Sequence, residues 1–200
     1  MQSFISRYSV IDYNHISLNG KPLWEQKNEV LHPEEVYRKM EMSYPKFFKM
    51  DLLCKWAIIG AECLLKEKEH YAYEAMDKTK IAVVLMTASG CLDVDKKYLA
   101  SMESIASPAL FVYTLPNIML GEISIRHGFK GEQLCLMSDT PDAEELFFWV
   151  NDLLLHKNMD ACLCGWINAV YEKQEVRLLW VDKKKGAAFT QENLALCLKK

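Results

Sequence analysis

The chain has 200 residues, of which 50% are apolar and 26% charged, so it can bury one substantial core and is not expected to be disordered. Its formal net charge of -3 comes from interspersed basic and acidic residues, which argues against a nucleic-acid partner, because phosphate binding needs a clustered basic face. No run of roughly 20 apolar residues and no leader-like start are present, so we expect a cytoplasmic protein without a membrane span.

The amino-terminal part of the chain is expected to elaborate a single domain that covers residues 1–200. No repeat, low-complexity tract or long linker interrupts the sequence, and residues 1–42 form the elaboration. Within it, Phe4 to Ile11 mixes β-branched and aromatic residues, and Asn19-Gly20 is a favoured two-residue turn, which together predict a short hairpin. Pro33, followed by two glutamates, marks the start of a helix.

The next part of the chain alternates helical and strand patterns. From Lys49 to Lys66 apolar residues recur every three or four positions, which predicts an amphipathic helix with one face in the core. Ile81 to Met86 is an unbroken apolar run, as in a strand covered on both faces. A short helix is expected from Asp93 to Ser104. Its Asp93 and Asp95 suit helix capping better than a calcium site, which also needs a glycine and a later glutamate.

The second half of the chain predicts further alternation. A helix is expected from about Pro116 to Arg126, then a strand from Gln133 to Met137. The helix from Asp142 to His156 is apolar around most of its circumference, so we expect it to be buried on several sides, between layers. Two strands, Asp160 to Ala169 and Glu175 to Asp182, are expected to form a hairpin.

A short final helix capped by Thr190 completes the predicted elements. Alternating strands and helices predict an α/β fold with a mixed, mostly parallel sheet covered by helices. Seven cysteines, an odd number, lie in apolar segments, which indicates reduced, buried thiols. Cys162 and Cys164 form a CxC pair without a second cluster of Cys or His, so we expect core packing, no metal and no cofactor.

The stretch from Ser107 to Gly131 carries the most distinctive pattern: a serine-proline turn, a helix with an asparagine and a glycine four residues on, and two further glycines. Over residues 43–182 the chain resembles the amino-terminal domain of β-ketoacyl synthases, in the thiolase-like superfamily. It is most similar to the short ketosynthase-like or chain-length-factor-like proteins of aryl polyene pigment pathways. The positions that carry the resemblance are Ser107, Pro108, Asn117, Gly121, Gly128 and Gly131.

The resemblance implies half of a thiolase-like fold, an acyltransferase family and a place in fatty-acid or polyketide biosynthesis. It also implies a cysteine nucleophile at a strand-to-helix turn, where the helix amino terminus lowers the thiol pKa. Counting from Gly131, that position falls in the window Ser138, Asp139 and Thr140, which contains no cysteine. Asp142 or Thr140 as helix cap, with proline between them as the first helical residue, explains the window by helix initiation alone.

The family's remaining catalytic groups, two histidines and a lysine, come from a carboxy-terminal half, and we expect this chain to end before that half. His127 and His156 lie near predicted helix ends, where a positive charge is favourable and no catalysis is needed. We therefore expect no catalytic residue and a pseudoenzyme that does not condense acyl units alone.

A partner is the structural consequence of the resemblance. In thiolase-type folds two similar halves share a central layer of helices, and a lone half exposes the helix after the nucleophile. Leaving its large apolar side chains in water is unfavourable, so we expect the surface of Phe147, Phe148 and Trp149 to be covered. A homodimer or a heterodimer with a full ketosynthase would cover it, and an acyl carrier protein is the other partner that the resemblance implies.

Two alternatives stay open. The chain could be an acyl-thioester transferase or thioesterase that uses Cys135, Ser138 or Cys164, although such a nucleophile needs a base and the spacing indicates no histidine partner. It could instead be an unrelated, flavodoxin-like binding domain with its ligand loop at the turn from Thr87 to Gly90. That turn lacks the glycine-rich phosphate pattern.

Overall fold

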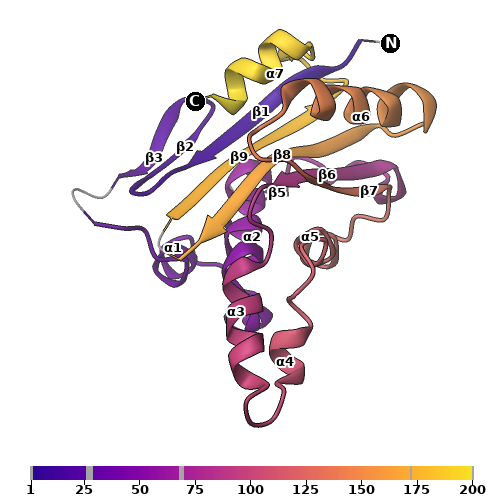
Figure 1. The fold of residues 1–200 in the computed structure, drawn as a ribbon. Coiled ribbons are helices and arrows are strands. Elements are labelled where there is room, and N and C mark those ends of the chain that lie inside the picture. Colours follow the sequence, from indigo (N-terminus) through magenta and orange to yellow (C-terminus); the bar gives the residue numbers. More distant parts are fainter. Residues whose placement is uncertain (1, 26–28, 68–69, 172, 200) are drawn as a thin grey trace.

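The computed structural model describes residues 2–25, 29–67, 70–171 and 173–199. One mixed sheet crosses the molecule in the order β3-β2-β1-β9-β8-β6-β7, with β10 beside β1 (Figure 1). Helices α2 and α5 cover one face and α6 and α7 the other, and each face has its own hydrophobic cluster. Within the described ranges, no helix combines the length and the apolarity that crossing a bilayer requires.

The strands and helices have the following bounds. The strands are β1 (Phe4–Ile11), β2 (His15–Leu18), β3 (Lys21–Glu25), β4 (Lys66–Glu67), β5 (His70–Tyr71), β6 (Ile81–Thr87), β7 (Gln133–Met137), β8 (Ala161–Val170), β9 (Lys173–Asp182) and β10 (Ala187–Ala188). The helices are α1 (Pro33–Lys39), α2 (Leu52–Leu65), α3 (Leu92–Ser101), α4 (Pro108–Phe111), α5 (Ile118–His127), α6 (Ala143–His156) and α7 (Gln191–Leu198), with 3-10 turns η1 (Pro45–Lys49) and η2 (Lys78–Lys80).

The α/β fold and the mixed sheet are confirmed, but the expectation of mostly parallel pairing is wrong. In the described part of the chain the only parallel pairs are β6–β7 and β6–β8. The pairs β8–β9, β1–β9, β1–β2 and β2–β3 are antiparallel. The physical reason is that β1 and β2, β2 and β3, and β8 and β9 follow each other closely in the chain, and strands joined by a short connection pair antiparallel.

The amino-terminal hairpin is confirmed and extends the main sheet. Asn19 and Gly20 join β2 to β3 with φ of 52° and 75°, the left-handed conformation that two-residue hairpin turns require. Pro33 begins α1, and the oxygen of Thr190 accepts a hydrogen bond from the backbone N–H of Asn193 at the start of α7, as expected. Asp93 does not cap α3, whose cap position is Cys91; instead it lies in the first turn.

Strand β6 is buried at every position, as the apolar run predicts. Its side chains alternate between the two clusters, with Ile81, Val83 and Leu85 under α2 and α5, and Val84 and Met86 under α6. The strand therefore joins both hydrophobic clusters of the domain.

Helix α2, not α6, is the helix buried on nearly all sides, so the two expectations for these helices are reversed. In α2 only Leu52 and Lys55 are less than fully buried, because the helix packs against α1, α5 and the sheet. Helix α6 packs one face on the sheet and leaves Phe148 and Leu155 at least half exposed. Helix α6 therefore does not lie between layers of this chain. The apolar side chains on its outer face made it look like a central helix in the sequence.

The reversal predicts where truncation of an apolar side chain destabilises the chain. Ile58 in α2 is fully buried, so Ile58→Ala should lower the free energy of unfolding by about 2–5 kcal/mol. Leu155→Ala in α6 should change it by less than about 1 kcal/mol, since half of that side chain is exposed. Urea unfolding followed by circular dichroism measures both, and equal losses would contradict the assignment of α2 as the central helix.

Candidate functional site

The predicted nucleophile window lies at the turn between β7 and α6. The backbone N–H of Ser138 donates to the carbonyl oxygen of Thr87 at 3.1 Å, which continues the pairing of β7 with β6. The Ser138 hydroxyl donates to the carbonyl oxygen of Thr140 at 2.8 Å. Asp139 and Thr140 are exposed. The Ser138 hydroxyl therefore closes a local turn, and no described histidine contacts it.

Helix initiation at this turn is carried by Asp142. Its Oδ1 accepts hydrogen bonds from two backbone N–H groups in the first turn of α6, those of Glu144 and Glu145, at 2.9 and 3.0 Å. Of the two caps that the sequence left open, Asp142 is the one used, and Pro141 precedes the helix instead of being its first residue. The turn thus satisfies the helix amino terminus with a carboxylate, which is the group that the helix dipole favours there.

The three candidate thiols and hydroxyls of the enzyme alternative are not brought together. Cys135 is half-buried in β7, and burial raises the pKa of its thiol to about 11, so it stays protonated at neutral pH. Cys164, with Cys162, is fully buried in the cluster beneath α6. In the described residues no hydrogen bond joins a histidine to Cys135, Ser138 or Cys164, and no three metal-ligating side chains gather anywhere.

The turn after β6 holds itself together and does not form a phosphate loop. The Asn168 side-chain oxygen accepts from the Ser89 backbone N–H at 2.9 Å, and the Gly90 N–H donates to the Thr87 hydroxyl at 3.3 Å. These internal bonds occupy the N–H groups that a phosphate would need. The antiparallel β9 and β1 also exclude the all-parallel flavodoxin order, so the flavodoxin-like alternative is wrong.

The serine-proline turn of the predicted family pattern has a clear local role. Ser107 caps α4, with its hydroxyl accepting from the Leu110 backbone N–H at 3.4 Å, and Pro108 is the first residue of that helix. Asn117 takes the cap position of α5 but makes no capping bond with its side chain. These positions organise the chain between α3 and α5.

The three glycines of the pattern differ in backbone conformation and in the space available for a side chain. Gly128 ends α5 in the left-handed conformation, with φ of 74°. A Cβ on Gly131 would lie 2.4 Å from the carbonyl oxygen of Ile81, closer than atoms can approach. A Cβ on Gly121 would meet no atom within 4 Å. Two glycines are therefore explained by this fold, and the contacts of the chain do not require the third.

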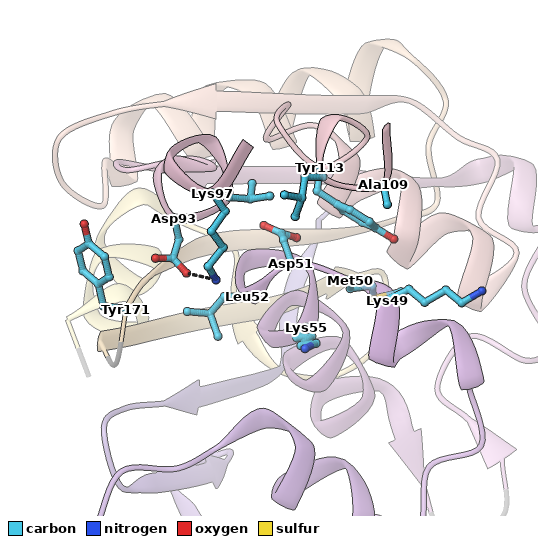
Figure 2. A pocket seen from close by; sticks show the side chains of 12 residues that line it. Lys49, Met50, Asp51, Leu52, Lys55, Asp93, Lys97, Ala109, Tyr113 and Tyr171 are labelled. Atoms are coloured by element: carbon cyan, nitrogen blue, oxygen red, sulfur yellow. Dashed lines mark hydrogen bonds and ion pairs between the residues drawn. The ribbon is translucent and has the colours of Figure 1, made fainter. Parts of the chain in front are cut away.

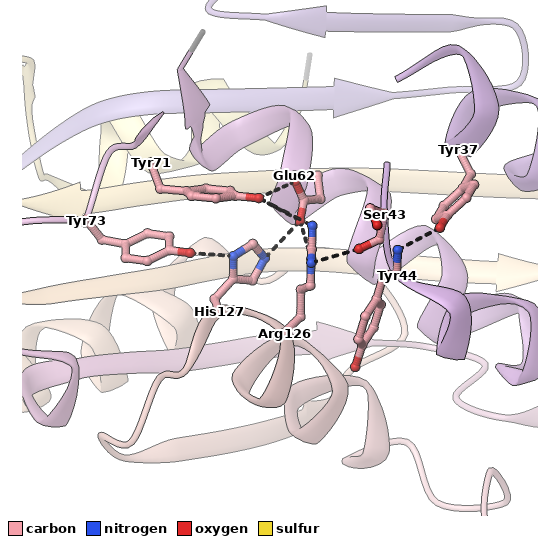
Figure 3. A network of polar contacts seen from close by, with 8 residues as sticks. All are labelled: Tyr37, Ser43, Tyr44, Glu62, Tyr71, Tyr73, Arg126 and His127. Carbon is pink, nitrogen blue, oxygen red and sulfur yellow. Dashed lines mark hydrogen bonds and ion pairs between the residues drawn. The ribbon is translucent and has the colours of Figure 1, made fainter. Parts of the chain in front are cut away.

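A buried polar network that the sequence analysis missed links α2 to α5 (Figure 3). Glu62, 1% exposed, accepts from Arg126 Nε at 2.7 Å and from the Tyr71 hydroxyl at 3.1 Å. His127 Nδ1 lies 2.8 Å from the Tyr73 hydroxyl, and its Nε2 lies 3.9 Å from Glu62. A lone carboxylate in the apolar stretch 56–65 was the available signal, since a buried charge needs a partner.

His127 is neutral in this network, so the interpretation of its charge as favourable at a helix end is wrong. Burial lowers the pKa of His127 to about 3, and the nearby positive charges of Arg126 and Lys78 act in the same direction. Glu62 does not offset this, because its carboxylate is already bound by Arg126. His156 lies exposed in the last turn of α6.

A cavity of about 370 Å³ opens between the start of α2, α3 and α4 (Figure 2). Three lysines and two aspartates line it, and Lys97 Nζ lies 3.1 Å from the Asp93 carboxylate. At its floor Asp51 caps α2, and burial raises the pKa of that carboxyl. Among the described residues that line the cavity, none is a cysteine, serine or histidine, so it offers binding chemistry and no nucleophile.

The predicted partner surface on α6 is divided between different environments. Phe147 turns inward, with its ring centroid 5.1 Å from that of Phe189, and Trp149 is half-buried against the cluster beneath α6. Phe148 alone of the three is strongly exposed, at 60%. Successive helical positions point about 100° apart, which explains why three consecutive residues do not form one face.

No protein-family model matches the sequence, and no curated protein matches it significantly. Solved structures do resemble the fold. The ishigamide ketosynthase/chain length factor aligns with 94% of this chain at a TM-score of 0.67 and 14% identity. A chain from the complex of ketosynthase ApeO with its chain length factor ApeC from Xenorhabdus doucetiae aligns with 100% of this chain, at a TM-score of 0.60 and 12% identity. The third structure is the type II polyketide synthase complex AntDE:AntF, an acyl-carrier protein with its ketosynthase bound to the hexaketide. It aligns with 92% of this chain, at a TM-score of 0.61 and 9% identity.

These matches define the fold of this chain as that of the ketosynthases and chain length factors, so the expected thiolase-like half is confirmed at the level of the fold. The lengths differ among them. This chain covers 63% and 62% of the matched chains in the ishigamide and AntDE:AntF structures, but 91% of the matched chain in the ApeO–ApeC complex. A protein of similar length to this one is therefore found in a complex of a ketosynthase with its chain length factor.

The contrast between Gly131 and Gly121 gives a matched pair of substitutions. Gly131→Ala should destabilise the chain by about 1–3 kcal/mol, because the new Cβ overlaps the Ile81 carbonyl. Gly121→Ala should stabilise it by about 0.5–1 kcal/mol, since alanine favours a helix and the Cβ meets open space. Urea unfolding measures both, and a loss of stability in Gly121→Ala would show that the site is not open.

The buried neutral His127 predicts a defined pH dependence. The unfolded chain takes up a proton at this residue near pH 6.5, whereas the folded chain does so only near pH 3, so its contribution to stability falls as the pH drops between these values. His127→Gln should reduce the slope of unfolding free energy against pH by up to about 1.4 kcal/mol per pH unit, the effect of one proton. Urea unfolding between about pH 7 and pH 5 measures the slope.

The exposed His156 provides the control for this measurement. His156→Gln should leave the wild-type slope unchanged. A His127→Gln chain with the wild-type slope would contradict the assignment of a neutral, buried histidine.

Proposed function

We propose that this chain is a non-catalytic, ketosynthase-like subunit that pairs with a full-length ketosynthase in fatty-acid or polyketide biosynthesis of the aryl polyene kind. In this proposal the ketosynthase carries out the condensation in the cytoplasm. This chain covers part of its partner and helps to shape the tunnel that holds the growing acyl chain. An acyl carrier protein delivers the acyl units to the pair.

The observation that carries the proposal is the turn between β7 and α6. A ketosynthase needs a thiolate at the start of a helix, where the helix dipole stabilises its negative charge. Here the Asp142 carboxylate occupies that helix end, and the residues before it are Ser138, Asp139 and Thr140. A second anion beside a capping carboxylate would be repelled, so the local electrostatics are adapted to a stable helix and not to a nucleophile.

Pairing is supported by the complexes in which chains of this fold are found. The matched chain of similar length belongs to a complex of a ketosynthase with its chain length factor, and another matched structure contains an acyl-carrier protein with its ketosynthase. The exposed Phe148 and Leu155 on α6 give the pair one apolar surface to cover. A homodimer would use the same surface, and it is the second form of pairing that the proposal allows.

Acyl transfer by this chain itself has less support. A serine or cysteine nucleophile needs a general base within hydrogen-bond reach. The Ser138 hydroxyl donates a hydrogen bond to the backbone carbonyl of Thr140, and burial keeps the Cys135 thiol protonated by raising its pKa.

The proposal is tested by the chemistry of the purified chain and by its assembly. Incubated with an acyl-carrier-protein thioester, the chain should show no added acyl mass, whereas a full-length ketosynthase treated in the same way should be acylated at its cysteine. Co-expressed with tagged full-length ketosynthases from the same genome, the chain should be retained in a stoichiometric complex with one of them.

Two outcomes would sink this proposal. One is acylation of the chain that disappears in Cys135→Ala or Ser138→Ala, which would make it an enzyme. The other is a chain that remains a monodisperse monomer at micromolar concentration and is retained by none of the ketosynthases.

A further inference from the structure

Residues 92–115 form an arm that projects from the body of the molecule (Figure 1). It consists of α3, a tip, α4 and the turn that follows. The only buried side chains in these residues are Val94 and Tyr113, which join the arm to the core around α2. The rest of the arm extends beyond the sheet (Figure 1).

The arm is unusually apolar for a segment in this position. A soluble monomer seldom exposes a continuous apolar patch of more than a few hundred Å². Each of the following side chains of the arm is more than half exposed: Ile105 (85%), Leu99 (68%), Phe111 (59%), Leu115 (57%), Met102 (56%) and Val112 (52%). Such a surface indicates a site of contact with another molecule.

The charge of the arm indicates the kind of molecule that it contacts. Its outer part, from Tyr98 to Leu115, has Glu103 as its only charged residue, and the two lysines of the arm, Lys96 and Lys97, precede this part in α3. Segments that bind a lipid surface carry lysine and arginine beside their apolar face, and the outer part of the arm, where the exposed apolar side chains lie, has neither. The arm therefore suits an apolar groove in a protein.

The tip of the arm is already ordered by its own hydrogen bonds. The Ser101 hydroxyl accepts from the Ser107 backbone N–H at 3.1 Å and donates to the Tyr98 carbonyl at 2.6 Å. The Thr114 hydroxyl donates to the Phe111 carbonyl at 2.8 Å. Because the polar groups bond within the arm, the apolar side chains are presented on a preformed support, and docking orders little new backbone.

We propose that this arm docks into an apolar groove of the full-length ketosynthase, an inference that rests on the proposed function. The cavity at the base of the arm is lined by three lysines and two aspartates, so this chain offers poor shelter there to the arm of a second copy. The ketosynthase is the occupant that agrees with the comparisons, since the matched chain of similar length belongs to a ketosynthase complex. The arm thus provides the main contact, and α6 a secondary one.

The test places a charge at the centre of the arm and at a matched position elsewhere. Ile105→Asp and Phe111→Asp alter strongly exposed side chains, so the folded chain should be retained, with an unchanged thermal unfolding midpoint. Leu23→Asp is the control, because Leu23 is 55% exposed on β3, at the opposite edge of the sheet from β7. Each variant is titrated by biolayer interferometry against the ketosynthase that retains the wild-type chain.

Each arm variant should weaken binding by at least about 30-fold, as expected for the loss of a central apolar contact, while Leu23→Asp should change it less than about 3-fold. Arm variants that bind as tightly as the wild type would overturn the docking inference and leave the proposed function standing. A wild-type chain that stays a monomer and is retained by no ketosynthase would instead reject the proposed function. A homodimer that the arm variants dissociate, without binding to any ketosynthase, would overturn the choice of occupant.

Discussion

Burial of β6 on both faces is the constraint on which the rest of the structure depends. Its seven residues are fully buried, and the strand pairs in parallel with β7 and β8 while its side chains enter both hydrophobic clusters. A strand in this position needs helices on both faces, which α2 with α5 and α6 with α7 provide. The carboxyl end of β6 also fixes the turn between β7 and α6, because Ser138 bonds to Thr87. The predicted nucleophile window and the core are thus connected through one strand.

The sequence predicted most elements because their signals were local. The apolar run at Ile81, the turn at Asn19-Gly20 and the cap at Thr190 each act through the backbone of a few neighbouring residues. The pairing direction of the strands was predicted less well, since it depends on which distant strands meet. The burial of α2 and α6 was reversed for a similar reason. Apolar residues on an outer face look the same in sequence as those in a core, and only the contacts separate them.

The sequence predicted the absence of a nucleophile at the candidate site, but it did not predict the buried polar network. The absence of a cysteine before Asp142 could be read directly, and the structure adds that the carboxylate of Asp142 occupies the helix end. The network of Glu62, Arg126 and His127 joins residues more than sixty positions apart, so the sequence shows the lone carboxylate of Glu62 but not which residues bind it. The arm was not predicted either, because the sequence shows a short helix and a serine-proline turn there but not that their apolar side chains are exposed.

An apolar arm that stays in water also influences how many copies of this chain a cell can keep. Chaperones and proteases continually remove proteins whose apolar surface remains accessible, and such surface also promotes aggregation. A chain that presents Ile105 and Phe111 to solvent is open to both processes until another molecule covers them. If the arm docks as proposed, copies made in excess of the partner would therefore be removed faster than paired copies, and the amount of this protein would follow the amount of its partner.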